Sequence, residues 1–146
     1  MPSLLDIRNL YLHYADRLGA VRAVDGVSFT LDGGGQALGI VGESGSGKSS
    51  LALAIMRMLP TNLARFDGEI YLNGQEITRL PEAQLRREIR WRKIALVPQG
   101  AMNGFNPVVR VGEQIIEPAL VYGDLDRRTA RARATNRRTA SACPIA

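Results

Sequence analysis

One run of nine residues constrains this chain more than any other stretch: Gly42-Glu-Ser-Gly-Ser-Gly-Lys-Ser-Ser50. An uninterrupted apolar run, Ala37–Val41, precedes it, and a helical pattern of apolar residues begins at Lys48. A glycine-rich loop between a strand and a helix lets successive N–H groups turn inward around an anion. The helix that follows adds the positive end of its dipole. The run therefore predicts a phosphate-binding loop.

The spacing Gly42-x-x-x-x-Gly47-Lys48-Ser49 matches the P-loop pattern. Lys48 would place a positive charge on the β- and γ-phosphates, the Ser49 hydroxyl would be a ligand of Mg²⁺, and Ser50 would add a hydrogen bond to phosphate. The alternative is a glycine-rich turn that matches by accident, at odds of roughly one in 200 for a chain of this size. The strand and helix patterns on either side favour nucleotide binding.

The order of the expected elements indicates an α/β architecture with an antiparallel β piece near the N-terminus. Alternating or apolar runs predict strands, and apolar residues at helical spacing predict helices. The expected strands are Leu4–His13, Val21–Leu31, Ala37–Val41, Gly68–Leu72 (followed by a turn at Asn73-Gly74) and Ile94–Val97; the expected helices are Lys48–Leu59, Pro81–Arg92 and Val111–Tyr122.

Composition narrows the setting. A chain of 146 residues with 45% hydrophobic residues fits one domain. The longest apolar stretch, Leu51–Leu59, is too short to span a bilayer, and the N-terminus lacks the apolar run of a signal peptide. The single cysteine, Cys143, excludes an internal disulfide. A cytoplasmic location is therefore expected.

Further motifs surround the P-loop. About 40 residues of mostly β sequence precede it. Three further stretches resemble segments of one protein family: Arg22–Phe29, Gly68–Gly74 and Val97–Ile115. Over residues 3 to about 123 the chain resembles the ATP-binding subunits of ABC transporters, and Asn106–Ile115 is similar to the oligopeptide, dipeptide and nickel importer branch. The resemblance implies a P-loop NTPase core of the ABC type, with the N-terminal antiparallel β piece, incomplete at the C-terminus.

The resemblance also implies a site for ATP and Mg²⁺. Gln99 would be the glutamine of the Q-loop, which coordinates Mg²⁺ or orients a water. Tyr14 would stack on adenine, although Tyr11 could serve by sequence alone; strand alternation puts the two tyrosines on opposite faces, so at most one should reach the base. The full expected set is Tyr14, Gly42, Ser44, Gly45, Ser46, Gly47, Lys48, Ser49, Ser50 and Gln99, with Ser49 and Gln99 as metal ligands.

Groups that the family uses for hydrolysis do not occur in this sequence: the Leu-Ser-Gly-Gly-Gln signature, the Walker B strand with its catalytic Glu, and the switch His. We therefore predict no catalytic residue. Residues 1–125 are expected to be the N-terminal part of an ABC-type domain, and residues 126–146 an Arg/Ala-rich tail, disordered or outside the family, although Arg127–Ala134 could begin the next helix. A frameshift or truncated gene model would explain this end.

The function implied is that of an ATPase subunit powering import of oligopeptides or dipeptides (or nickel) from the inner face of the membrane. Its partners would be permease subunits, a second ATP-binding subunit and, indirectly, an extracytoplasmic binding protein. The alternatives are an inactive nucleotide-binding fragment, or another P-loop NTPase with a nucleic-acid-binding tail.

Basic residues are not expected to bind nucleic acid in the body of the chain. Residues 1–125 hold 13 basic and 13 acidic residues, so the net charge of +5 lies in residues 126–146. The basic run Arg86–Lys93 could suggest nucleic acid, but the neutral body favours a solvated helix face. His13 is expected to be a strand residue without a chemical role.

Overall fold

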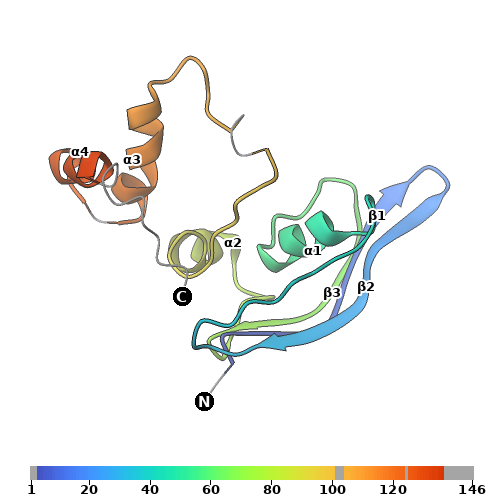
Figure 1. Cartoon of the computed structure of the whole chain (residues 1–146). Coiled ribbons are helices and arrows are strands. Elements are labelled where there is room, and N and C mark those ends of the chain that lie inside the picture. Colours follow the sequence, from blue (N-terminus) through green and yellow to red (C-terminus); the bar gives the residue numbers. More distant parts are fainter. Residues whose placement is uncertain (1–2, 101–103, 124, 137–146) are drawn as a thin grey trace. The chain divides into compact units, whose positions relative to one another are not determined.

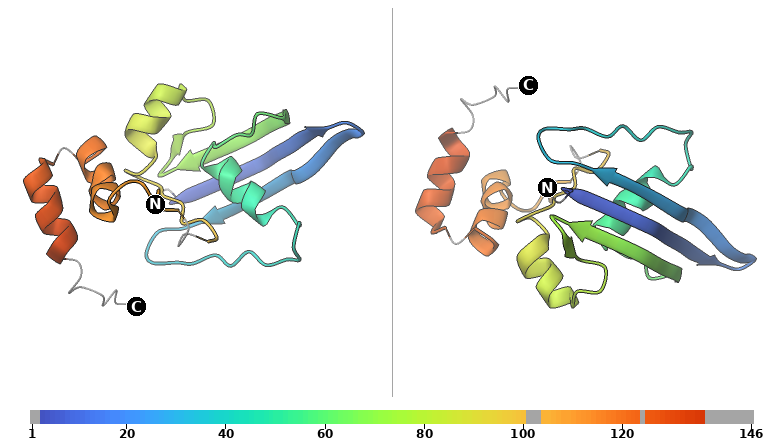
Figure 2. Two further views of the ribbon diagram at one scale, coloured as in Figure 1. Left: turned by 90° about the horizontal axis from the view of Figure 1, so that it is seen from above. Right: turned by 90° about the horizontal axis from the view of Figure 1, so that it is seen from below.

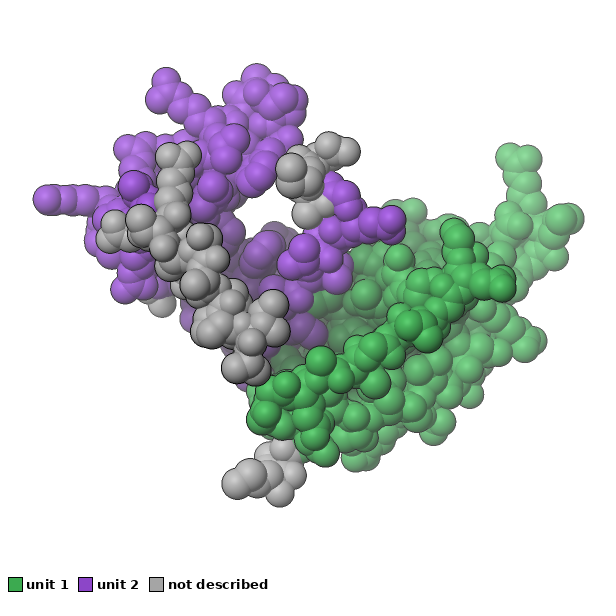
Figure 3. Space-filling view, viewed as in Figure 1, with its two compact units in different colours: residues 1–85 green, residues 86–146 purple. Residues whose placement is uncertain are grey.

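The computed structural model describes residues 3–100, 104–123 and 125–136. The chain divides into two compact units, residues 1–85 and residues 86–146 (Figure 3). Cys143 and the last part of the tail lie outside the described residues.

The first unit is built on a small antiparallel sheet (Figure 1). Strand β1 (Leu5–Asp16) pairs on one side with β2 (Gly19–Leu31) and on the other with β3 (Leu63–Leu72). The two-residue strand β4 (Gln75–Glu76) pairs with the end of β3, which gives the order β2-β1-β3-β4. The antiparallel β piece expected near the N-terminus is confirmed.

Within the first unit, helix α1 (Lys48–Ile55) lies over one face of this sheet, and the view from below shows the strands in front of the helix (Figure 2). Side chains on the covered face alternate with polar ones along the strands, as a half-buried sheet requires. The buried core of the unit includes Ile7, Leu10, Leu12, Val24, Leu51, Ala54, Ile70 and Leu72. The sheet and α1 thus form one core, from which the loop before α1 emerges.

Glycine is needed at two points of β3, in its turn into β4 and at its contact with β1. Asn73 and Gly74 have positive φ values of 50° and 77°, which is the geometry of a type I′ hairpin turn and confirms the turn expected there. Gly68 has a φ of +105°, and a Cβ atom placed on it would lie 2.3 Å from the carbonyl oxygen of Asn9. Only glycine fits at this point, where the register of β1 and β3 shifts.

Helix α1 ends at Ile55, four residues earlier than the sequence predicted. Arg57 adopts a left-handed φ of 50°, and the N–H groups of Arg57 and Met58 donate to the carbonyls of Ala54 and Leu53. This is a Schellman cap with arginine where glycine is usual. The Arg57 guanidinium donates to the carbonyls of Ile77 and Leu80 at 3.1 and 2.6 Å, and these bonds compensate for the backbone conformation.

Two expected buried strands do not form. Within the described residues, Ala37–Val41 pairs with no strand and Val41 is 93% exposed. Ile94–Val97 has only an isolated bridge from Ile94 to Arg90. Both predictions were wrong for this structure. A parallel strand is stable only between neighbouring strands and under covering helices, and the described residues supply no such neighbour.

The predicted helix Pro81–Arg92 is also replaced by shorter pieces. A three-residue helix, α2 (Glu82–Gln84), leads into a five-residue π-helix, η1 (Leu85–Ile89). In the second unit, α3 (Val111–Val121) continues through Pro118, and α4 (Arg127–Asn136) follows it.

Helices α3 and α4 bury Ile116 and Ala130, and Glu113 pairs with Arg127 at 3.1 Å and with Arg131. The possible helix from Arg127 is thereby confirmed. Among the described residues, the longest helices are well below the length and apolarity that crossing a bilayer demands.

Candidate nucleotide-binding site

The loop before α1 wraps around the ammonium group of Lys48. The lysine Nζ donates to the carbonyl oxygens of Gly42 and Glu43 at 2.7 and 2.6 Å, and it lies 3.1 Å from the hydroxyl of Ser46. A turn from the Ser46 N–H to the Glu43 carbonyl, at 3.2 Å, tightens the loop. The three contacts hold a positive charge at the centre of the loop, where an anion would bind.

The N-terminus of α1 adds donors to the same place. Gly47 is the N-cap residue, and no side chain caps the helix. The Leu51 N–H donates to the Gly47 carbonyl at 2.8 Å. The N–H groups of Lys48, Ser49 and Ser50 precede the first intrahelical bond, and an α-helix leaves such groups for an external acceptor. With the helix dipole, they favour a phosphate oxygen at this position.

The three glycines of the loop are required for three different reasons. A Cβ on Gly42 would lie 2.7 Å from the Ser46 hydroxyl, so a side chain there would displace that hydroxyl from its place beside Lys48. Gly45 has a φ of +83° with open surroundings, so it is needed for its backbone angle. Gly47 combines a φ of +89° with an approach of 2.1 Å between its Cβ position and the Ala23 carbonyl oxygen. The loop is thus shaped against strand β2.

Tyr14 lies at the mouth of the loop and Tyr11 does not. The Tyr14 hydroxyl donates to the Ser50 hydroxyl at 2.9 Å, and the ring lines a cavity of about 390 Å³. Tyr11 instead packs under the guanidinium of Arg65, 3.8 Å from the ring centroid, and against the edge of His13. Only one of the two tyrosines therefore reaches the cavity, and it is Tyr14.

The cavity beside Tyr14 gathers most of the predicted binding residues. Its remaining lining comes from β2 and from the loop and first turn of α1: Val21, Arg22, Ala23, Gly45, Ser46, Gly47, Lys48, Ser49 and Ser50. The contribution of β2 to this wall is not apparent from the sequence. No motif marks it, because the contact depends on how Gly47 packs against the strand.

His13 also has a partner that the sequence did not reveal. Its side chain is buried, and Nε2 lies 3.0 Å from the Asp25 carboxylate. Asp25 in turn lies 3.6 Å from the guanidinium of Arg22. This group ties β1 to β2 one residue before Tyr14, which stabilises the wall of the cavity.

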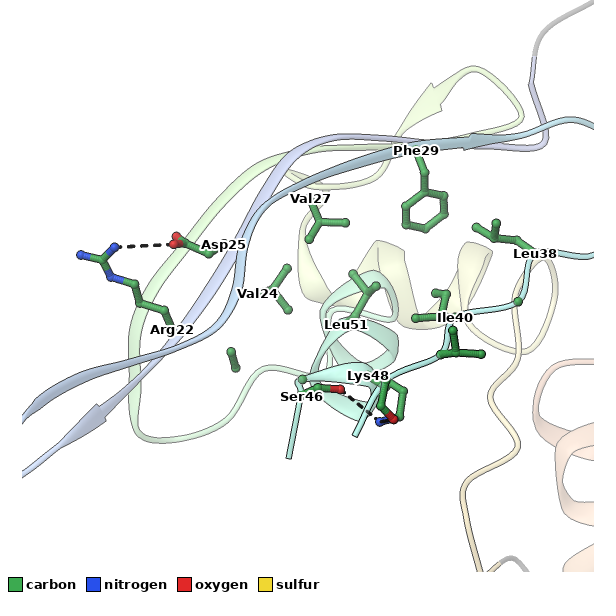
Figure 4. Close-up of a pocket in the computed structure, with 15 residues that line it drawn as sticks. Arg22, Val24, Asp25, Val27, Phe29, Leu38, Ile40, Ser46, Lys48 and Leu51 are labelled. Atoms are coloured by element: carbon green, nitrogen blue, oxygen red, sulfur yellow. Dashed lines mark hydrogen bonds and ion pairs between the residues drawn. The ribbon is translucent and has the colours of Figure 1, made fainter. Parts of the chain in front are cut away.

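A second, larger cavity of about 670 Å³ adjoins the loop (Figure 4). Val27 and Phe29 of β2, Leu38 and Ile40 of the unpaired segment, and Leu51 of α1 surround it with apolar side chains. In Figure 4, the Arg22 side chain turns away from this cavity towards Asp25. Leu38 and Ile40 thus face this cavity, although their segment forms no strand.

Two predicted residues are not brought into the cavities. Ser44 is exposed and lines neither of them. Gln99 belongs to the second unit, where it is exposed in a turn beside Gly100, whose φ is +75°. The role of Gln99 at a metal stays a prediction.

A glycine loop that encloses a lysine and runs into a helix N-terminus defines the P-loop class of proteins. The chain belongs to the ABC transporter family, whose sequence model matches residues 24–142. It is 41% identical over 130 residues to the oligopeptide transport ATP-binding protein OppD of Haemophilus influenzae, covering 89% of this chain and 39% of that protein. It is 42% identical to OppD of Salmonella typhimurium, covering 87% of this chain and 37% of the relative.

Solved structures agree on the fold. A dimeric ATP-binding cassette in a post-hydrolysis state, bound to ADP and Pi, superposes with a TM-score of 0.71 at 23% identity. The match covers 90% of this chain and 54% of that one. The predicted α/β fold of ABC ATPase cassettes is therefore confirmed. The chain spans less than two fifths of the length of the two OppD relatives.

Proposed function

We propose that this chain binds ATP with Mg²⁺ at the loop of residues 42–50. The observation that carries the proposal is the enclosed ammonium of Lys48 beside the N-terminal N–H groups of α1. These groups would contact the phosphates, and the Tyr14 ring would stack on adenine across the 390 Å³ cavity. The remaining loop residues, Ser44 and Ser46 included, would shape the phosphate site.

The donor set also fits a magnesium ion. Mg²⁺ prefers oxygen ligands and keeps several waters and phosphate oxygens. Ser49 lies in the first turn of α1 and lines the cavity, so its hydroxyl would supply one ligand. Gln99 would supply or orient another through its amide oxygen. The metal would neutralise phosphate charge, while Lys48 and the helix N–H groups orient the phosphates.

We further propose a role in peptide import. Relatives named as oligopeptide transport ATP-binding proteins support an ABC-type subunit at the inner face of the membrane. Its partners would be permease subunits, a second ATP-binding subunit and, indirectly, an extracytoplasmic binding protein. The solved cassette that shares the fold is described as dimeric, which agrees with pairing of two such subunits.

The test uses two matched tyrosine variants. We expect Tyr14→Leu to weaken displacement of a fluorescent ATP analogue by ATP about tenfold, since base–aromatic stacking contributes about 1–3 kcal/mol. Tyr11→Leu removes an identical ring from the other face and should leave the affinity within about twofold. Lys48→Ala should lower affinity by at least about tenfold, as the loss of a charged hydrogen-bonding group does. Equal effects of the two tyrosine variants would contradict the proposed adenine platform.

A further inference from the structure

The segment after η1 has an unusual backbone. The N–H groups of Lys93 and Ile94 both donate to the carbonyl of Ile89, at 2.9 and 3.2 Å, and the Trp91 N–H donates to the Ile94 carbonyl at 2.9 Å. Trp91 has a φ of +68°, which is rare for a bulky side chain. Strained residues and π-helical turns concentrate at functional sites, since packing must hold them in place.

This turn presents an aromatic ring and two cations at the surface. Ile89 is 1% exposed and anchors the turn, whereas Trp91 is 58% exposed. Arg92 and Lys93 follow it and are also exposed. Holding this tryptophan outward on a left-handed backbone costs free energy in the isolated chain. A stabilising contact between the indole and a binding partner would explain the arrangement.

The neighbouring surface is concave and basic. Arg87, Glu88, Arg92 and Lys93 line a shallow hollow of about 610 Å³, in which the Arg87 guanidinium pairs with the Glu88 carboxylate at 2.9 Å and three cations face one acid. Residues 86–93 contain five basic residues and one acidic residue. The second unit, residues 86–146, carries 12 basic and five acidic residues, whereas the first carries seven and nine. Within the second unit, residues 86–93 contribute a net charge of +4 and residues 126–146 a net charge of +5, so this surface is one of two basic segments.

We propose that the basic hollow of Arg87, Arg92 and Lys93 binds the anionic headgroups of a lipid bilayer, with the Trp91 indole in the interfacial layer. Tryptophan favours the membrane interface, and each Lys or Arg near an anionic leaflet contributes about 1 kcal/mol. A short basic patch with one aromatic ring is suited to a lipid surface. A protein that tracks a nucleic acid strand uses a longer basic groove. The choice of a membrane rests on the proposed function.

The protein contains one tryptophan, so its fluorescence reports on this surface directly. The full chain is titrated with vesicles of phosphatidylcholine alone and of phosphatidylcholine with phosphatidylglycerol at low salt. We expect the anionic vesicles to shift the Trp91 emission to the blue and to protect it from acrylamide, and 0.5 M KCl to reverse both effects. No change with anionic vesicles would overturn the proposal.

Charge-reversed variants locate the contact. Arg87→Glu should weaken partitioning about 30-fold, which corresponds to about 2 kcal/mol for losing one attraction and adding one repulsion. Arg79→Glu makes the same charge change in the first unit, at an arginine whose side chain is 79% exposed, and should alter partitioning by less than about threefold. Equal losses would show general electrostatic attraction and would refute a defined surface.

Three more measurements separate the proposal from its alternatives. Trp91→Gly removes the indole while favouring the left-handed backbone, so it should weaken vesicle co-sedimentation without loss of folding; unchanged co-sedimentation would contradict the role of the ring. Lys48→Ala should bind vesicles like the parent chain, so failure of nucleotide binding and failure of lipid binding are distinct results. If a duplex oligonucleotide shifts the Trp91 emission at lower concentration than vesicles do, the surface binds nucleic acid and the lipid proposal is wrong.

Discussion

Replacing Gly47 by alanine tests how the loop is built against the sheet. The new Cβ would lie 2.1 Å from the Ala23 carbonyl oxygen, which is backbone and cannot turn aside, and the φ of +89° would remain. A left-handed conformation costs roughly 1–2 kcal/mol for a residue other than glycine, and overpacking adds about 1–3 kcal/mol. We therefore expect a loss of stability of about 2–5 kcal/mol together with loss of nucleotide binding.

Urea unfolding followed by circular dichroism measures this loss, with two further glycine variants as references. Gly45→Ala has the same angular strain in open space, so it should cost about 1–2 kcal/mol. Gly33→Ala meets no atom within 4 Å and has no positive φ, so it should be neutral or slightly stabilising. A Gly47→Ala variant that is no more destabilising than Gly45→Ala would refute the predicted clash with the Ala23 carbonyl.

Two other predictions follow from single contacts. Arg57→Ala removes two hydrogen bonds to backbone carbonyls and should lower the free energy of unfolding in urea by about 1–3 kcal/mol. Arg57→Gly should lower it less, because glycine adopts the left-handed backbone at this position without strain. In the second unit, the hydrogen bond from Arg131 and the nearby Arg127 hold the pKa of Glu113 below its ordinary value of 4.5. The stabilisation of α3 against α4 is therefore complete above about pH 4.5 and is lost as the pH falls through the lowered pKa.

Each of these has a control. Equal destabilisation by Arg57→Gly and Arg57→Ala would show that glycine relieves no backbone strain at the C-terminal cap of α1. Carboxyl chemical shifts measured by NMR follow Glu113 during acid titration, and Arg131→Ala should raise its apparent pKa towards the ordinary value. An unchanged titration in that variant would show that the pair does not form in solution.

The local features of the fold were predictable from the sequence because they depend on neighbouring residues. The hairpin at Asn73-Gly74, the start of α1 at Lys48 and the opposite faces of Tyr11 and Tyr14 each follow from spacing or turn chemistry. The P-loop also follows, since its glycines and lysine lie within one run.

Features that depend on distant partners were not predictable. The helix α1 stops at Ile55 because Arg57 finds carbonyls of residues 77 and 80, far along the chain. The apolar run Ala37–Val41 suggested a strand, but a strand needs a neighbour that no local pattern reveals. The wall that β2 gives to the nucleotide cavity depends on the packing of Gly47 against Ala23.

Phosphate binding by the loop of residues 42–50 is the central property proposed for this chain. The most direct measurement is an amide NMR titration of the chain with Mg²⁺ and a non-hydrolysable ATP analogue. We predict that the largest shifts occur at the N–H groups of Gly45 to Ser50, which surround Lys48 and begin α1, and that Lys48→Ala removes them. Shifts confined to other parts of the chain, or unchanged by Lys48→Ala, would contradict the account.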